Sequence, residues 1–106
     1  MALARIQLPE RIQRGDLVEV RLVIQHPMET GFRLDTDMRK VPKNAIRSFV
    51  CRYNGEEIFR AELSPGIAAN PYLQFPTRVE ASGEFEFSWV DDSGARDTAK
   101  EMLTVV

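Results

Sequence analysis

Two segments of the chain alternate apolar and polar residues with a period of two, LVEVRLVIQ at residues 17–25 and EFEFSWV at residues 84–90. This period is expected of a strand that buries one face and exposes the other. Each segment therefore predicts a strand with an apolar inner face, formed by Val18, Val20, Leu22 and Ile24 in the first and by Phe85, Phe87 and Trp89 in the second.

Shorter strand patterns fill most of the remaining chain. Turns that contain Gly, Pro, Asn or Asp separate them, and no helical period of ten residues is found. The additional strands are predicted at residues 4–8, 46–53, 56–63, 72–79 and 98–105. Seven short strands in a chain of 106 residues favour a single domain over residues 1–106, an all-β, immunoglobulin-like antiparallel β-sandwich. A small barrel is the alternative.

The dipeptide Asn54-Gly55 predicts a two-residue hairpin turn, because both positions tolerate the positive φ values of a type I′ turn. This turn sets Tyr53 opposite Glu56 and Arg52 opposite Glu57. The same register, continued along the hairpin, divides its residues between two faces. We predict that the core face carries Ile46, Ser48, Val50, Arg52, Glu57, Phe59, Ala61 and Leu63.

The opposite face of this hairpin mixes charged residues with apolar and aromatic ones. Its apolar members are Phe49, Cys51, Tyr53 and Ile58. Because an apolar cluster rimmed by charges is typical of a contact surface, we predict that this face is exposed and binds another protein. The alternative is that loops of the same chain cover it.

Two irregular segments interrupt the strands, HPMETGFRLDTDMRKVP at residues 26–42 and SPGIAANPYLQF at residues 64–75. Irregular loops on a rigid sandwich are where binding usually resides. These loops are therefore the first places to look for function.

The composition excludes several classes of protein. Acidic and basic residues are interleaved and give a net charge of -2, which argues against nucleic-acid binding. No apolar stretch approaches the roughly twenty residues of a membrane helix. The first fifteen residues lack the apolar core of a secretory signal, so the chain is expected to carry no export signal of its own.

The chemistry available to the chain is sparse. His26 and Cys51 are its only histidine and cysteine, so no ligand spacing for a metal is present, and neither a metal nor another cofactor is expected. DDSG at residues 91–94 reads as a hairpin turn. Cys51, in the middle of a strand, is interpreted as a packing residue, with an intermolecular disulfide as a lesser possibility.

Three motifs carry a resemblance to a known family: HPMETGFR at residues 26–33, NPYLQF at residues 70–75 and WVDDSG at residues 89–94. In order and spacing they resemble SoxZ, the small subunit of the SoxYZ carrier complex of bacterial sulfur oxidation. The resemblance implies a non-catalytic subunit that pairs with SoxY in a heterodimer or higher heteromer during thiosulfate or sulfur oxidation.

In that family the SoxY subunit holds the sulfur covalently on a cysteine of its C-terminal arm, and other Sox enzymes act on the loaded arm. The present chain ends in LTVV and shows no such arm. The resemblance also implies that the chain reaches the periplasm by co-export with its signal-bearing partner.

Two groups of residues are predicted to contact the partner. One is the hairpin group, Phe49, Cys51, Tyr53 and Ile58. The other is a loop expected to touch SoxY, its arm or the enzymes that act on it: Met28, Glu29, Thr30, Gly31 and Arg33. Alternatively, Glu29 and Thr30 only shape the turn before Gly31. Two other functions stay open, a sulfur-handling enzyme that uses Cys51 and a generic immunoglobulin-like binding module.

Overall fold

Eight strands and no helix make up the part of the chain that the computed structural model describes, residues 4–63 and 69–106. None of it forms a helix long and apolar enough to cross a membrane. The strands are β1 (Ala4–Gln7), β2 (Arg11–Ile12), β3 (Leu17–Ile24), β4 (Ile46–Tyr53), β5 (Glu56–Glu62), β6 (Tyr72–Arg78), β7 (Gly83–Asp91) and β8 (Arg96–Val105).

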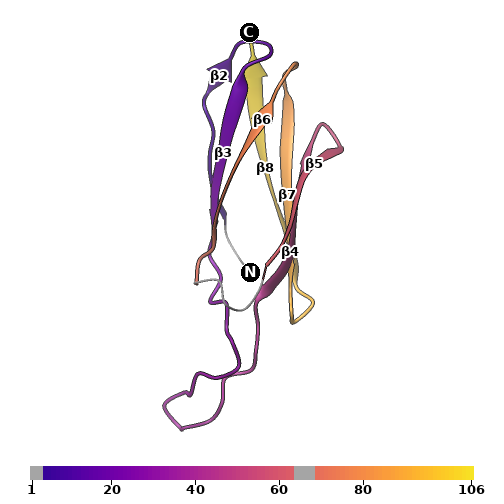
Figure 1. Ribbon diagram of the computed structural model, residues 1–106. Helices are drawn as coiled ribbons and strands as arrows, with labels where there is room; N and C mark the ends of the chain where they lie inside the picture. Colours follow the sequence, from indigo (N-terminus) through magenta and orange to yellow (C-terminus); the bar gives the residue numbers. More distant parts are fainter. Residues whose placement is uncertain (1–3, 64–68) are drawn as a thin grey trace.

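The strands form two sheets packed face to face (Figure 1). One has three strands in the order β1-β3-β6, and the other has five in the order β2-β8-β7-β4-β5. The sheets remain separate, so the fold is the predicted sandwich and not the alternative barrel. All seven predicted strands are present, and their ends lie within two residues of the predicted positions.

The eighth strand, β2, was not predicted. It pairs in parallel with the end of β8, where Arg11 lies opposite Thr104 and Ile12 opposite Val105. The chain therefore leaves the three-stranded sheet after β1 and joins the five-stranded sheet at β2. A strand of two residues is too short to show a period, which is why the sequence pattern does not reveal it.

The core lies between the two sheets and is rich in aromatic rings. The inner faces predicted for β3 and β7 are confirmed, because all seven of their apolar residues are at most 5% exposed. At the open side of the sandwich Phe59 of β5 stacks on Phe75 of β6, with ring centroids 4.2 Å apart. This pair joins the two sheets where no backbone hydrogen bonds connect them.

The turn at Asn54-Gly55 forms as predicted, with φ values of 51° and 85°. Tyr53 lies opposite Glu56 and Arg52 opposite Glu57, but the register then shifts and Cys51 lies opposite Phe59. Ile58 is thus the extra residue of a β-bulge. A second irregularity, between Ile46 and Ser48, changes the register of β4 against β7.

The face assignment was wrong for Phe49, Cys51 and Tyr53 of β4, whereas Phe59 and Leu63, predicted for the core face, do pack against the core. Phe49 and Cys51 are both 0% exposed and lie in the core, and the ring of Tyr53 packs against Phe85 at 4.6 Å. Opposite them in register are the inward Trp89, Phe87 and Phe85 of β7, which fixes the face. Ile46 is buried as well. In a regular strand, residues three positions apart lie on opposite faces, but the bulge between Ile46 and Ser48 lets Ile46 point inward like Phe49.

Candidate binding surface

A ribbon of two irregular segments, residues 27–44, projects from the end of the sandwich between β3 and β4 (Figure 1). It gives the molecule its long axis of 56 Å against 20 Å in the other two directions. At its base, Glu29 and Asn44 exchange two backbone hydrogen bonds, of 2.7 and 2.9 Å. Leu34 and Lys40 form a second bridge closer to the tip.

The ribbon turns sharply at Gly31, where φ is +92°. A side chain there would be strained, and its Cβ would lie 3.3 Å from Cβ of Lys43. The Thr30 hydroxyl accepts a hydrogen bond from the backbone N–H of Phe32 at 3.3 Å. Thr30 and Gly31 therefore shape the turn, in line with the local alternative raised by the sequence.

Glu29 and Arg33 form an ion pair along the ribbon, in which the Arg33 guanidinium donates to both carboxylate oxygens at 2.7 to 3.0 Å. The hydrogen bond from Arg33, the largest effect, lowers the pKa of Glu29, and the same bond raises the pKa of Arg33. The Arg33 guanidinium is therefore paired with a carboxylate of its own ribbon.

The tip of the ribbon is a tight turn capped by Asp35. Its carboxylate accepts hydrogen bonds from the backbone N–H groups of Asp37 and Arg39, at 2.9 and 3.0 Å. The Asp35 carbonyl accepts another from the N–H of Met38, whose φ is 62°. An aspartate that caps its own turn is a frequent device of tight loops. The tip therefore has a defined conformation.

The base of the ribbon is where the three family-like motifs meet. The backbone N–H of His26 donates to Oδ1 of Asn70 at 3.0 Å, and the N–H of Asn70 donates to the His26 carbonyl at 2.7 Å. Nε2 of His26 lies 3.2 Å from Oδ2 of Asp91. One residue from each motif thus contributes to a single anchor, which we call the His26 anchor (His26, Asn70 and Asp91).

The tautomer of His26 follows from its contacts. Nδ1 accepts a hydrogen bond from the backbone N–H of Met28 at 3.0 Å, so Nε2 carries the proton and donates it to Asp91. Burial is the largest effect on Asp91 and raises its pKa, but hydrogen bonds from Ser93, His26 and Ala95 outweigh it, and the pKa lies below the ordinary 3.8. The anchor is therefore a buried imidazole held by a carboxylate.

Met28 belongs to this base and not to the exposed surface, although it was expected to offer an apolar contact to a partner. It is 4% exposed, and its sulfur accepts a hydrogen bond from the backbone N–H of Ile46 at 3.3 Å. The expected exposure of Met28 was wrong. The polarizable thioether instead fills the space between the ribbon and the core.

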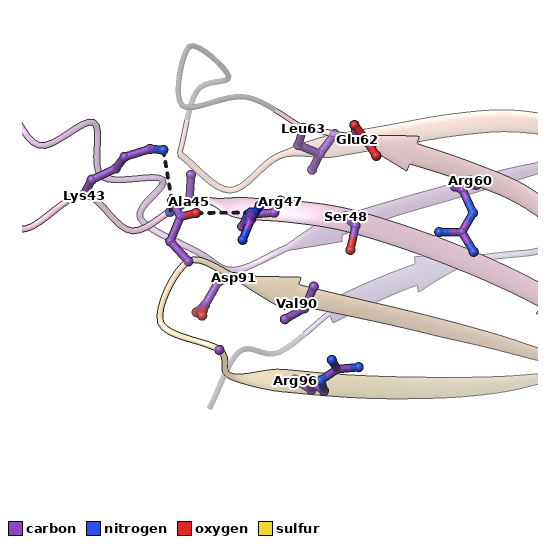
Figure 2. Close-up of a pocket in the computed structure, with 12 residues that line it drawn as sticks. Lys43, Ala45, Arg47, Ser48, Arg60, Glu62, Leu63, Val90, Asp91 and Arg96 are labelled. Atoms are coloured by element: carbon purple, nitrogen blue, oxygen red, sulfur yellow. Dashed lines mark hydrogen bonds and ion pairs between the residues drawn. The ribbon is translucent and has the colours of Figure 1, made fainter.

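A groove runs along the outer face of the five-stranded sheet and begins at the foot of the ribbon, with a volume of about 670 Å³. Ser48 of β4 and Val90 of β7 lie on its floor, between Arg60 of β5 and Arg96 of β8 (Figure 2). At the ribbon end, Asp92 forms ion pairs with Lys43 at 3.7 Å and Arg47 at 3.5 Å.

The floor of the groove extends along the sheet through Val50, Ser88 and Thr98, which share the next row of the register. One row further, Lys100, Glu86, Arg52 and Glu57 alternate in charge across four strands. Glu86 lies 4.0 Å from Lys100 and 3.7 Å from Arg52. The floor of the groove therefore consists of small side chains, and the charges of the next row neutralise one another.

Cys51 is unsuited to chemistry. Its side chain lies in the core, and burial raises the pKa of the thiol to about 12. A thiol in this state has almost no thiolate at neutral pH, which removes the basis for a nucleophile. The described residues also contain no group of three or more His, Cys, Asp or Glu side chains that could hold a metal.

The residues predicted to bind a partner thus fall into two sets. Thr30 and Arg33 are exposed, and Glu29, Gly31, Tyr53 and Ile58 are half-buried. The others, Met28, Phe49 and Cys51, are buried, so the exposure on which their prediction depended was wrong. For the segment SPGIAANPYLQF, residues 64–68 lie outside the described residues.

The most exposed apolar side chains of the ribbon are not among the residues predicted to contact a partner. Phe32 is 81%, Met38 73% and Leu34 45% exposed. The sequence does contain one indication of their exposure. They lie in a polar segment without any period, and such a segment has no buried face that could receive apolar side chains.

Comparison with known proteins identifies the family. The family model described as "Sulphur oxidation protein SoxZ" matches residues 6–102. A search of curated proteins gives no match.

Several solved structures share the fold. A superoxide reductase (neelaredoxin) variant from Ignicoccus hospitalis has a TM-score of 0.76 at 19% identity, over 97% of this chain and 79% of its own. The putative superoxide reductase of Thermotoga maritima has a TM-score of 0.72 at 14% identity, over 97% and 85%. The sulfur carrier protein SoxY from Chlorobium limicola has 0.69 at 13%, over 97% and 78%. At these identities the likeness concerns the fold alone.

Proposed function

The chain belongs to the SoxZ family of sulfur-oxidation proteins, and from this premise we propose that it is the non-catalytic subunit of a SoxYZ-type carrier. It binds a SoxY-type subunit and supports it, while the arm cysteine of that subunit holds the covalent sulfur intermediate of thiosulfate or sulfur oxidation. Other Sox enzymes then act on the loaded arm and not on this chain.

The observation that carries this proposal is the position of Cys51. It is the chain's single cysteine, it is 0% exposed, and its pKa is raised to about 12 by burial. A carrier of covalent sulfur requires an accessible thiolate. The buried thiol therefore supports the proposal that another polypeptide supplies the thiol of the complex, and it disfavours an enzyme that would use Cys51.

Within this function, the exposed part of the predicted loop is proposed to contact the partner. Thr30 and the ion pair of Glu29 with Arg33 form one side of the ribbon, with Gly31 at its bend. Tyr53 and Ile58 at the hairpin tip are retained as lesser contacts, because both side chains are half-buried and pack on the core.

The experiment is co-purification and thiol labelling. The tagged chain is co-expressed with a SoxY-type subunit of the same organism, and the purified complex is treated with a thiol probe at neutral pH. We expect a stable complex in which only the SoxY-type arm is labelled. A native chain that reacts through Cys51, or one that captures no SoxY-type subunit, would contradict the proposal.

The place of action is proposed to be the periplasm, reached by co-export with the signal-bearing partner. Cell fractionation tests this directly. We expect the chain in the periplasmic fraction when the SoxY-type subunit is co-expressed, and in the cytoplasmic fraction when the signal of that subunit is deleted. Export that is independent of the partner would refute this part.

A further inference from the structure

Three large apolar side chains are exposed together on one projecting element, Phe32, Leu34 and Met38 of the ribbon. Single exposed apolar residues are ordinary on a protein surface, but here they occupy a stretch of seven residues at 81%, 45% and 73% exposure. In the described part of the chain, none of the three belongs to the hydrophobic core or packs against it. Such a concentration on a protrusion is typical of a contact with another protein.

The ribbon holds these side chains in a preformed arrangement. Backbone hydrogen bonds of 2.8 Å from Val41 to Arg33 and 2.9 Å from Asp35 to Arg39 connect its two segments. The Asp35 cap fixes the tip, and the His26 anchor fixes the base. Because the conformation exists before binding, little conformational entropy is lost when a partner receives the tip.

The ribbon is continuous with the groove on the five-stranded sheet. Lys43 and Ala45, at the foot of the ribbon, also line the groove (Figure 2). A partner that lies on the groove would therefore meet the ribbon at its side. Ser48 and Ser88 on the floor have small side chains, which allow a partner to approach closely. The charges in the row at Glu86 are balanced, so this row repels neither a positive nor a negative partner surface.

The size of the surface indicates what it fits. The groove face spans four strands, because β2 pairs only with the end of β8; at a spacing of about 4.8 Å, with three rows of side chains about 7 Å apart, it covers roughly 400 Å². A stable heterodimer buries about 800 Å² on each partner. The sheet face alone is too small, so the remaining contact area has to come from a neighbouring element, and the 18-residue ribbon of residues 27–44 is continuous with the groove.

We propose that the SoxY-type subunit packs on the groove of the five-stranded sheet and is clasped by the ribbon, whose residues Phe32 and Leu34, just before the tip turn, insert into it. This inference depends on the proposed function, and it assigns the surface that performs it. Phe32 and Leu34 provide the apolar anchor of the interface, and the groove provides the wider contact area beside it. Apolar anchors surrounded by flat, weakly contributing contacts are the common design of protein interfaces.

The test measures the affinity of this chain for the purified SoxY-type subunit by isothermal titration calorimetry. The tip variant combines Phe32→Ser with Leu34→Ser, and the groove variant is Ser88→Arg. The matched control is Leu17→Ser, which removes an apolar side chain that is 62% exposed at the opposite end of β3. None of the four side chains is buried, so the fold is expected to tolerate each change.

We expect a loss of affinity of about tenfold or more for the tip variant and for the groove variant, and less than about twofold for the control. If the native chain binds but both variants bind equally well, the assigned surface is wrong while the proposed function stands. If the tip variant keeps its affinity but slows sulfur turnover, the tip docks an enzyme and the inference is overturned. If the native chain does not bind, the proposed function itself fails.

Discussion

The replacement Asp91→Ala tests whether the His26 anchor stabilises the fold. The Asp91 carboxylate is 12% exposed and accepts a hydrogen bond from Nε2 of His26 at 3.2 Å. It also accepts bonds from the N–H and hydroxyl of Ser93, at 2.9 and 2.5 Å, and from the N–H of Ala95 at 3.1 Å. Alanine removes all four acceptor contacts and leaves the imidazole N–H of His26 without a partner.

The expected cost is unequal among these bonds. The Ser93 and Ala95 donors are exposed and can bind water in the variant, so their loss contributes little. His26 is 6% exposed, and an unsatisfied buried donor costs about 1 to 3 kcal/mol. We therefore expect Asp91→Ala to lower the free energy of unfolding by about 2 to 3 kcal/mol, a value dominated by the single bond to His26.

Urea unfolding followed by the fluorescence of Trp89 measures this cost. Trp89 is the single tryptophan, it is 5% exposed, and it lies two residues before Asp91 in β7. Asp37→Ala is the control, because Asp37 is an exposed aspartate on the ribbon, and its loss is expected to cost less than about 0.5 kcal/mol. Equal midpoints for the two variants would refute the anchoring role.

The pH dependence provides a second readout for the same variant. Because the pKa of Asp91 is lower in the folded chain than its ordinary 3.8, the charged carboxylate stabilises the fold above that pH, and this contribution is lost as the pH falls. The difference in stability between the native chain and Asp91→Ala is therefore expected to be complete at pH 7 and to shrink below about pH 4. A difference that is constant down to pH 2 would show that the charge has no part in it.

Three further changes test the core and the hairpin turn. Cys51→Ser places a hydroxyl in the apolar core and is expected to cost about 1 to 3 kcal/mol in urea unfolding; a neutral result would mean that the thiol site is hydrated. Phe75→Ala removes the ring that stacks on β5 and should cost about 3 to 4 kcal/mol, while Tyr72→Ala on the exposed face should cost under about 1 kcal/mol. Gly83→Ala drives a methyl group into the Asn54 side chain, which accepts a hydrogen bond from the N–H of Glu84. The loss of unfolding free energy caused by Gly83→Ala is therefore expected to be smaller when Asn54→Gly is also present, and additive losses would contradict this contact.

Alternation and turn chemistry predicted most of the fold because they are local properties. The alternation in β3 and β7 follows directly from one buried face, and the Asn54-Gly55 turn determines its two adjacent residue pairs. Beyond those pairs the hairpin faces could not be inferred. The bulge at Ile58 depends on how β5 meets the rest of the sandwich, and the irregularity beside Arg47 depends on β7. Apolar residues also occur on both faces of β4, so apolar character does not tell the inner face from the outer one. Val50, for example, lines the outer groove and is still only 8% exposed.

The candidate surface was predicted only in outline. The segment 26–42 was correctly recognised as irregular, but its inner order depends on contacts with distant residues such as Asn70, Asp91 and Asp92. The three motifs that carry the family resemblance build the His26 anchor, because Asn70 of the second motif and Asp91 of the third hold His26 of the first. Sequence patterns show which residues of this segment are apolar. Which of them are buried, as Met28 is, and which are exposed, as Phe32 is, depends on the three-dimensional path of the chain.

The short parallel pairing of β2 with β8 has a mechanical consequence. Tension applied between the ends of the chain would pull these two strands in opposite directions along their common axis, since they run the same way. Their hydrogen bonds would be sheared together and not peeled one after another. Stretching in an optical trap should therefore load this patch in shear together with the pairing of β1 and β3, which lies nearer the N-terminus.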